Sequence, residues 1–155
     1  MRGSGMNEPG VLCTPLAREV LGALRHAGAE VEAWLERSVE PMGLSLAKMG
    51  ALHTLVEADE PIPLGQLAER LCCVKSNVTQ LVDRLEADSL VRRVPDPADR
   101  RSVRAEVTDE GRARFAAAIR ARQAAEAELL AGFDDDELER LAGWCRRVAS
   151  RGEAR

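Results

Sequence analysis

Apolar residues recur at spacings of three and four along most of the chain, which is the period of amphipathic helices. The first row predicts a long helix from about Pro15 to Ser38, because proline suits a first helical turn. A second row follows Ser45, whose side chain is placed to cap a helix that ends near the Pro-containing turn at 59–63. The first third of the chain is therefore predicted to be helical.

Two short apolar rows lie close together in the middle of the chain. Each has the i, i+3, i+4, i+7 spacing of a short helix: Leu64, Leu67, Ala68 and Leu71, then Val78, Leu81, Val82 and Leu85. Two short helices joined by so tight a turn are typical of a helix-turn-helix unit. We expect the second helix to begin near Lys75.

The pattern then changes to that of strands. Residues Leu90–Val94 and Val103–Val107 read as two strands, the second with clean alternation of apolar and polar positions. The polar segment 95–101 between them predicts a hairpin with a projecting tip.

The pattern returns to helices in the last third. Thr108 is placed to cap a helix running to about Ala131, and Asp134 with Glu137 forms a capping box before a final helix. We therefore predict a mainly α fold with a small β-hairpin wing.

Composition agrees with this fold class. Of the 155 residues, 45% are hydrophobic and only 3% aromatic, which favours helices packed by aliphatic side chains. The sequence has neither an apolar run of membrane-spanning length nor a basic segment followed by an apolar one, so a cytoplasmic protein is expected. The opening residues 1–5 resemble an expression scar.

Charge is unevenly distributed. The chain carries a net charge of −4, yet residues 90–104 hold five Arg against two Asp. The helix that starts near Lys75 offers groups suited to DNA, since Asn and Gln can pair with adenine and Ser, Thr, Lys and Arg can hold phosphates. These candidate DNA-binding residues are Lys75, Ser76, Asn77, Thr79, Gln80 and Arg84. The alternative is an ordinary solvated face.

The hairpin tip favours the DNA-binding interpretation. Arg100 and Arg101 lie on it, where they could reach an adjacent minor groove. The alternative is a salt-bridged loop in which Asp96 and Asp99 neutralise both arginines. We expect a division of labour, in which one aspartate supports the wing by pairing with one arginine while the other arginine contacts DNA.

The segment from Leu64 to Phe115 resembles the DNA-binding lobe of the MarR (multiple antibiotic resistance regulator) family. The resemblance rests on VTQLVDRLE, LVRRVPDPADRRS and VTDEG in combination, and the flanking helices extend it from about Leu16 to Val148. Many relatives have glycine where this chain has Cys72 and Ser89, so Cys72 is expected to take a left-handed conformation or the turn to differ.

The resemblance implies a homodimer, and the long apolar rows of the flanking helices, which exceed the partner surface of so small a lobe, agree with it. We expect residues 1–14 to form a tag or disordered arm, 15–40 and 109–150 a helical dimerisation region, and 44–108 the winged helix-turn-helix lobe. The function so implied is a transcription regulator, by family habit a repressor, that binds a pseudo-palindromic double-stranded DNA operator.

The resemblance also implies release from DNA by a small aromatic or carboxylate effector. Trp34, Met49 and His53 are the candidates for its site; the alternative is that Trp34 and Met49 fill the core and His53 lies at the surface. Some relatives instead sense oxidants through a cysteine near the N-terminus, a place that Cys13 occupies here.

Other chemistry is not indicated. The four cysteines and two histidines lack zinc-site spacing, the thiols are expected to be free and buried, and no cofactor or metal is expected. No motif for a nucleophile or a phosphate-binding loop is present, so an enzyme is not expected. The remaining alternatives are a thiol-based redox-sensing repressor of the same fold and a winged-helix protein-interaction module without DNA binding.

Overall fold

The computed structural model describes residues 14–99 and 102–153. Within these ranges the helices are α1 (Pro15–Val39), the 3-10 helix η1 (Glu40–Met42), α2 (Leu46–Ala58), α3 (Leu64–Arg70), α4 (Lys75–Ala87), α5 (Asp109–Leu130) and α6 (Asp135–Glu153). The strands are β1 (Ile62–Pro63), β2 (Val91–Pro95) and β3 (Val103–Val107). The predicted fold class, mainly helical with a small β wing, is confirmed.

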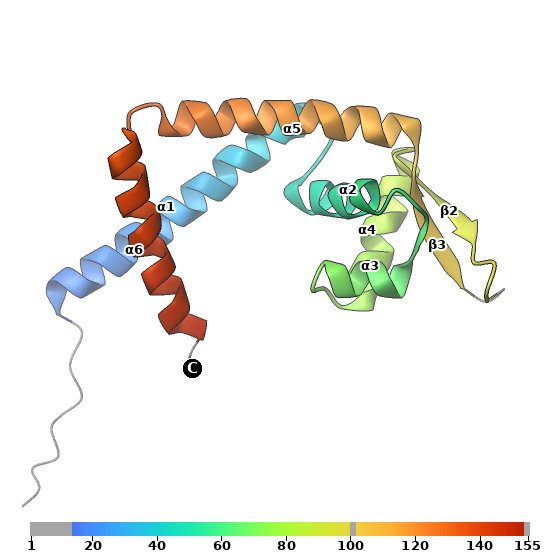
Figure 1. Cartoon of the computed structure of the whole chain (residues 1–155), viewed down its shortest axis with the longest axis horizontal. Coiled ribbons are helices and arrows are strands. Elements are labelled where there is room, and N and C mark those ends of the chain that lie inside the picture. The colour runs from blue at the N-terminus through green and yellow to red at the C-terminus, as the bar shows by residue number, and fades with distance from the viewer. Residues whose placement is uncertain (1–13, 100–101, 154–155) are drawn as a thin grey trace, which may run out of the picture.

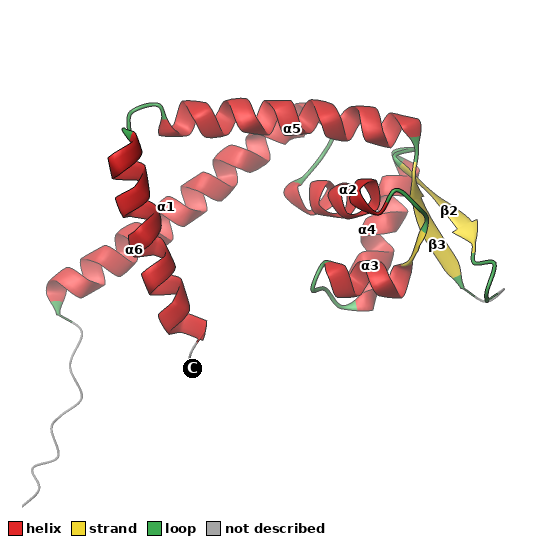
Figure 2. Ribbon diagram, in the orientation of Figure 1, coloured by secondary structure: helices red, strands yellow, loops and turns green. Residues whose placement is uncertain are grey.

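The helix α5 runs along one side of the molecule, and the other elements are arranged along its length (Figure 1; Figure 2). A compact lobe, which contains α2, α3, α4 and the three strands, lies against its first half, while α1 packs on it and α6 extends from its far end. None of the helices in the described ranges has the length and apolar character to cross a membrane.

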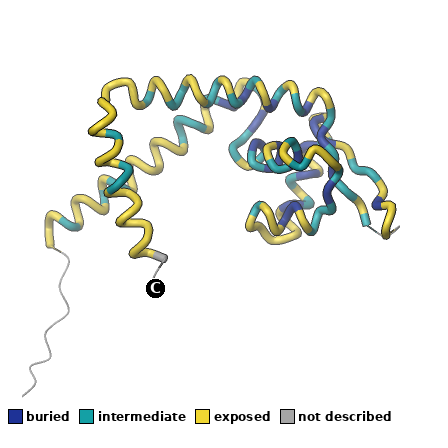
Figure 3. The backbone as a smooth tube through the Cα atoms, in the orientation of Figure 1, coloured by how far each residue is buried: buried dark blue, intermediate teal, exposed yellow. Residues whose placement is uncertain are grey.

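The buried core lies almost entirely in the lobe (Figure 3). It is built from the apolar rows of α2, α3 and α4 and from the inward side chains of the sheet, with Leu52, Leu55, Leu67, Val82 and Leu85 no more than 1% exposed. Phe115 and Ala118 of α5 close this core from above. The first half of α5 therefore belongs to the same packed unit as the helix-turn-helix.

Helix starts follow the predicted caps. The hydroxyl of Ser45 accepts a hydrogen bond from the Lys48 backbone N–H at 3.2 Å. Asp134 and Glu137 exchange the two hydrogen bonds of a capping box, at 2.8 and 3.1 Å. Both predictions are confirmed.

The sheet has one strand more than predicted. Its order is β1-β3-β2, antiparallel throughout, with Ile62 opposite Ala105 and Val91 opposite Val107. The segment 59–63 was expected to be only a turn, because a two-residue strand is too short to show a periodicity. Pairing with β3 instead fixes the link between α2 and α3 to the base of the wing.

Three residues other than glycine have left-handed backbone in the described part of the lobe: Asp59 after α2, with a φ of 51°, and one residue in each of the two turns that flank α4. Cys72 ends α3 with a φ of 50°, and Ser89 ends α4 with a φ of 61°. In each turn the following N–H reaches back to the last helical turn, from Cys73 to the Ala68 carbonyl at 3.0 Å and from Leu90 to the Leu85 carbonyl at 2.9 Å. Both are Schellman motifs, and the expected left-handed conformation of Cys72 is confirmed.

We predict that Ser89→Gly and Cys72→Gly each raise the free energy of unfolding by about 0.5–1 kcal/mol, because glycine adopts left-handed backbone without a Cβ clash. Urea unfolding followed by circular dichroism measures the change. Ala87→Gly, in the last turn of α4, is the matched control and should destabilise by up to about 1 kcal/mol. Equal effects of the three glycines would contradict the conformational argument.

Candidate nucleic-acid interface

The helix α4 has one buried face and one open face. Val78, Val82 and Leu85 are fully buried against the rest of the lobe. The open face carries most of the predicted DNA-binding side chains, and the exposed ones are Lys75, Ser76, Asn77, Gln80 and Arg84. Among the described residues, the side chains of Ser76, Asn77, Gln80 and Arg84 make no hydrogen bond or ion pair inside the chain. They are available to an external partner.

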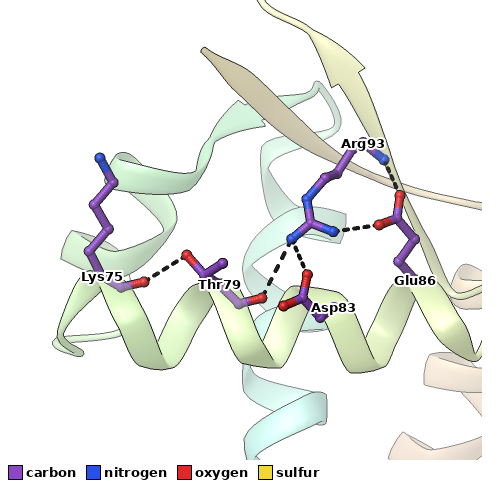
Figure 4. A network of polar contacts seen from close by, with 5 residues as sticks. All are labelled: Lys75, Thr79, Asp83, Glu86 and Arg93. Carbon is purple, nitrogen blue, oxygen red and sulfur yellow. Dashed lines mark hydrogen bonds and ion pairs between the residues drawn. The ribbon is translucent and has the colours of Figure 1, made fainter. Parts of the chain in front are cut away.

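Thr79 differs from its neighbours on this helix. It is only partly exposed, and its hydroxyl donates to the Lys75 carbonyl at 3.1 Å (Figure 4). A hydroxyl engaged with its own helix is less able to read a base edge. Thr79 was predicted to contact DNA with the others, but its engaged hydroxyl and partial burial make it less suited to that contact.

The start of α4 is held by backbone contacts. Val74 occupies the N-cap position and is 63% exposed, but it has no side-chain acceptor for the first-turn N–H groups. The Asn77 N–H donates to the Val74 carbonyl at 3.0 Å, and the two N–H groups before it are left to solvent or to an anion such as a DNA phosphate. The helix begins at Lys75, as predicted.

Arg93 of β2 fixes α4 to the wing (Figure 4). Its guanidinium pairs with Glu86 at 2.5 Å and with Asp83 at 2.6 Å, and its backbone N–H donates to Glu86 at 3.1 Å. Partial burial opposes the charged form, but the hydrogen bonds to Asp83 and Glu86 outweigh it and raise the pKa of Arg93. One arginine thus joins two carboxylates of the helix to the strand beside it.

The wing is supported by a pair that differs from the expected one. Asp96 is nearly buried and accepts hydrogen bonds from Arg104 of β3 at 3.0 Å and from the Ala98 backbone N–H at 2.9 Å. The bond from Arg104, followed by that from Ala98, holds the pKa of Asp96 below its ordinary value. Wing support by Asp96 therefore comes through a strand arginine.

Asp99 supports the wing through its backbone, because its carbonyl accepts from the Ser102 N–H at 2.9 Å. Arg100 and Arg101, the predicted wing contacts, lie outside the described residues. Their position relative to α4 stays a prediction.

Charge counting along the sequence overstated the free positive charge of the hairpin. Arg92 pairs with Glu106 across β2 and β3 at 2.7 Å, and the hydrogen bond from Arg92 lowers the pKa of Glu106. With Arg93 and Arg104 also paired, three of the five arginines in 90–104 are engaged within the fold. Any unpaired positive charge in this segment is thus left to Arg100 and Arg101, which lie outside the described residues.

The cysteines do not fill the core. Cys72, Cys73 and Cys145 are free, as predicted, but all three are exposed, which corrects the expectation that the thiols are buried. The preference of cysteine for the interior gave way to backbone placement, because both Cys72 and Cys73 belong to a turn at the surface. Cys13 lies outside the described residues.

A cavity of about 470 Å³ lies between α1, α2 and α5. Its apolar wall includes Met49 and Phe115, and its polar groups include His53 and Arg122. The rings of His53 and Phe115 lie 6.0 Å apart between centroids. Two of the three predicted effector-site residues are thus brought together.

Trp34, the third, is not part of this cavity. Its indole N–H donates to the Ala125 carbonyl at 3.0 Å, and the Arg37 guanidinium lies 5.7 Å from its ring centroid. The hydrogen bond to Ala125 fastens α1 to α5, whereas the contact with Arg37 stays within α1. Trp34 therefore acts in helix packing.

The chain is similar in sequence to a known protein family and to several transcriptional regulators. The sequence profile of the MarR family matches residues 44–103. The transcriptional regulator PecS of Dickeya dadantii is 29% identical over 83% of this chain and 79% of its own length, and the transcriptional repressor MdtR of Bacillus subtilis is 27% identical over 80% and 79%. Over residues 44–103 the chain therefore matches the MarR family. The chain is a transcriptional regulator that binds DNA and not an enzyme, like these relatives.

A solved structure agrees with the fold. A mutant of MarR from E. coli complexed with operator DNA superposes with a TM-score of 0.69 at 24% identity, covering 87% of this chain and 99% of that one. A likeness at this identity supports the winged-helix architecture of the MarR-family regulator.

Two residues of the interface were not singled out from the sequence. Arg93 and Arg104 were counted only as positive charge, yet both position the wing and α4. Arg104 also has its Nε buried without a hydrogen-bond partner among the described atoms. The alternation of β3 could have placed Arg104 on the face away from the core, but its partner depended on the fold of the loop.

We predict that Arg93→Met lowers the free energy of unfolding by about 1–3 kcal/mol, because two neighbouring carboxylates lose their shared cation. Arg92→Met is the matched control: it removes an exposed, solvent-screened pair on the adjacent residue and should leave the free energy of unfolding close to that of the unmodified chain. Urea unfolding measures both. Adding Glu86→Gln to Arg93→Met should recover part of the loss, and no recovery would argue against the ion-pair explanation.

Proposed function

We propose that this MarR-family regulator is a homodimeric repressor that binds a pseudo-palindromic operator and is released from it by a small-molecule effector. In this proposal residues 44–108 bind DNA, and residues 15–40 and 109–150 form the dimerisation region. The observation that carries it is the open polar face of α4 beside the wing, on a body whose remaining helices expose apolar faces.

The DNA-binding part follows from the chemistry of the open face. Asn77 and Gln80 have amides able to pair with adenine in the major groove, and Lys75, Ser76 and Arg84 surround them with phosphate-binding groups. Arg100 and Arg101 extend the contact into the minor groove beside it. Repression is proposed because the relative MdtR is a transcriptional repressor.

The dimer follows from where apolar surface is left uncovered. Eleven large hydrophobic residues are exposed in the described part of the chain, and nine of them lie on α1, on α6 or around the end of α5. They include Leu16, Leu21, Phe133 and Trp144, each about half exposed or more. Apolar surface concentrated at one end of a molecule marks an interface, and a second copy with the same helices supplies the matching surface.

Effector release would use the cavity between α1, α2 and α5. It joins the proposed dimerisation region to the lobe, so a ligand there can favour one placement of the two DNA-binding lobes over another. Apolar walls around Met49 and polar groups at His53 and Gln123 suit a small aromatic molecule with a carboxylate or hydroxyl group, while Arg122 is already paired with Glu126 at 2.7 Å.

Selection of bound sequences from fragmented bacterial DNA, followed by footprinting, tests the main proposal. We expect a pseudo-palindromic site whose affinity falls steeply with salt, because phosphate contacts release counterions. Arg100→Ala with Arg101→Ala should weaken operator binding by about tenfold or more. Arg120→Ala removes an exposed arginine of α5 and is the matched control, expected to bind as the unmodified chain does.

Light scattering on the same samples should give the molar mass of two chains for every variant. A single-chain mass would contradict the dimer, and affinity that is unaffected by the two wing substitutions would remove the wing from the interface. Binding indifferent to salt would contradict phosphate recognition by α4.

Thermal unfolding with a panel of aromatic carboxylic acids tests the effector cavity. A bound acid at about one hundred times its Kd should stabilise the protein by about 2.7 kcal/mol. His53→Ala should reduce that rise, whereas Trp34→Phe, outside the cavity, should keep it. Equal loss in both variants would contradict the assignment of the cavity.

A further inference from the structure

The turn between α3 and α4 presents two neighbouring thiols. Cys72 and Cys73 are consecutive, free and exposed. Their backbone is fixed, because the Cys72 N–H donates to Glu69 at 3.1 Å and the Cys73 N–H to Ala68 at 3.0 Å. We propose that Cys72 and Cys73 form a binding site for monosubstituted trivalent arsenicals, and that occupation of this site blocks DNA binding.

The spacing of the pair favours a bridging atom over a direct disulfide. Consecutive Cα atoms lie about 3.8 Å apart. That is below the roughly 4.4–6.8 Å that disulfides usually span, so an S–S bond here would require a strained ring. An inserted atom that binds two sulfurs enlarges the ring by one member and relieves that strain, and thiolates are soft ligands suited to such an atom.

The reaction requires no oxidant. An organoarsenic(III) oxide condenses with the two thiols: two As–S bonds form, the bonds from arsenic to its oxide oxygen break, and that oxygen leaves as water with both thiol protons. Arsenic stays trivalent and sulfur is not oxidised. The product is a cyclic dithioarsonite whose organic substituent stands at the surface of the turn.

The described cysteines give the site an internal comparison. Cys145 is also exposed, but it lies on α6 without a neighbouring cysteine in the sequence. It can form only one As–S bond, which an excess of a small monothiol displaces. When one As–S bond of a ring on Cys72 and Cys73 opens, the other bond keeps the freed thiol beside the arsenic, so the ring closes again. The ring therefore resists a monothiol and is opened only by a dithiol.

The position of the pair connects it to DNA. Cys73 is two residues before Lys75, and the exposed Val74 between them caps α4. An adduct there lies beside Lys75, Ser76 and Asn77, which the proposed function assigns to the operator. This consequence rests on the proposed function, whereas binding of the arsenical does not.

Phenylarsine oxide and the full-length protein provide the test, with intact-protein mass spectrometry and operator binding as separate readouts. In excess 2-mercaptoethanol we expect one retained arsenical per chain, removed by 2,3-dimercaptopropanol. Cys72→Gly fits the left-handed backbone and so keeps the turn, yet it should retain no arsenical. Cys13→Ser and Cys145→Ser together should retain it as the unmodified chain does.

Operator affinity of each variant is compared with its own value before the reagent. The unmodified chain should lose at least about tenfold, and Cys72→Gly should not change. Retention of the arsenical by Cys72→Gly, or none by the unmodified chain, would overturn the site. Retention without loss of DNA binding would overturn its regulatory role, and a protein that binds no DNA before treatment would instead refute the proposed function.

Discussion

The close approach of α5 to the end of α4 is the contact on which the rest of the structure depends. Thr108 caps α5 through Gly111, while its backbone N–H donates to the Leu90 carbonyl at 3.0 Å and its hydroxyl to the Ser89 carbonyl at 2.8 Å. A Cβ on Gly111 would stand 2.1 Å from the Leu90 oxygen, which no side chain can tolerate. The helix that carries the proposed DNA-binding groups and the helix that leads into α6 are therefore rigidly joined, and a change in the direction of α5 must carry α4 with it.

The charged side chains around this junction mainly hold its helices and strands in position. Arg93, Arg104 and Arg112 each pair with a carboxylate from another element, so α4, the wing and the α2–β1 turn are tied together by ion pairs. A strand arginine that is paired with a carboxylate contributes little positive potential at the open face of α4. The net charge of a segment is therefore a weak guide to its electrostatic role, and the exposed arginine of α4, Arg84, is better placed to meet a phosphate than its counterparts in the strands.

Local signals in the sequence were sufficient for most of the fold. Caps at Ser45 and Thr108 act within four residues, so the sequence alone predicts them. The β1 strand and the Asp96–Arg104 pair depend on segments that meet only after folding, and no local period reveals them. Cys73 was expected inside because isolated cysteines favour the core, but a Schellman turn holds it at the surface. Trp34 was a candidate for a ligand site by residue type, with helix packing as the alternative, and its hydrogen bond to Ala125 favours the alternative.

The helix α4 lacks a side-chain cap at its N-terminus, and the turns at its two ends help to hold it in place. Its first turn follows a left-handed Cys72 and its last turn precedes a left-handed Ser89, and in both turns backbone N–H groups satisfy the carbonyls of the helix before. Each left-handed residue with a Cβ is strained by an amount comparable to one good hydrogen bond, and the buried row from Val78 to Leu85 offsets that strain. Side chains anchor α4 from Val78 onward, through the buried Val78 and Val82 and through the two carboxylates that pair with Arg93 of β2. The first turn of α4 is therefore fixed by backbone contacts alone. Several of the residues proposed to contact DNA therefore lie at the least constrained end of the helix, next to the exposed thiols.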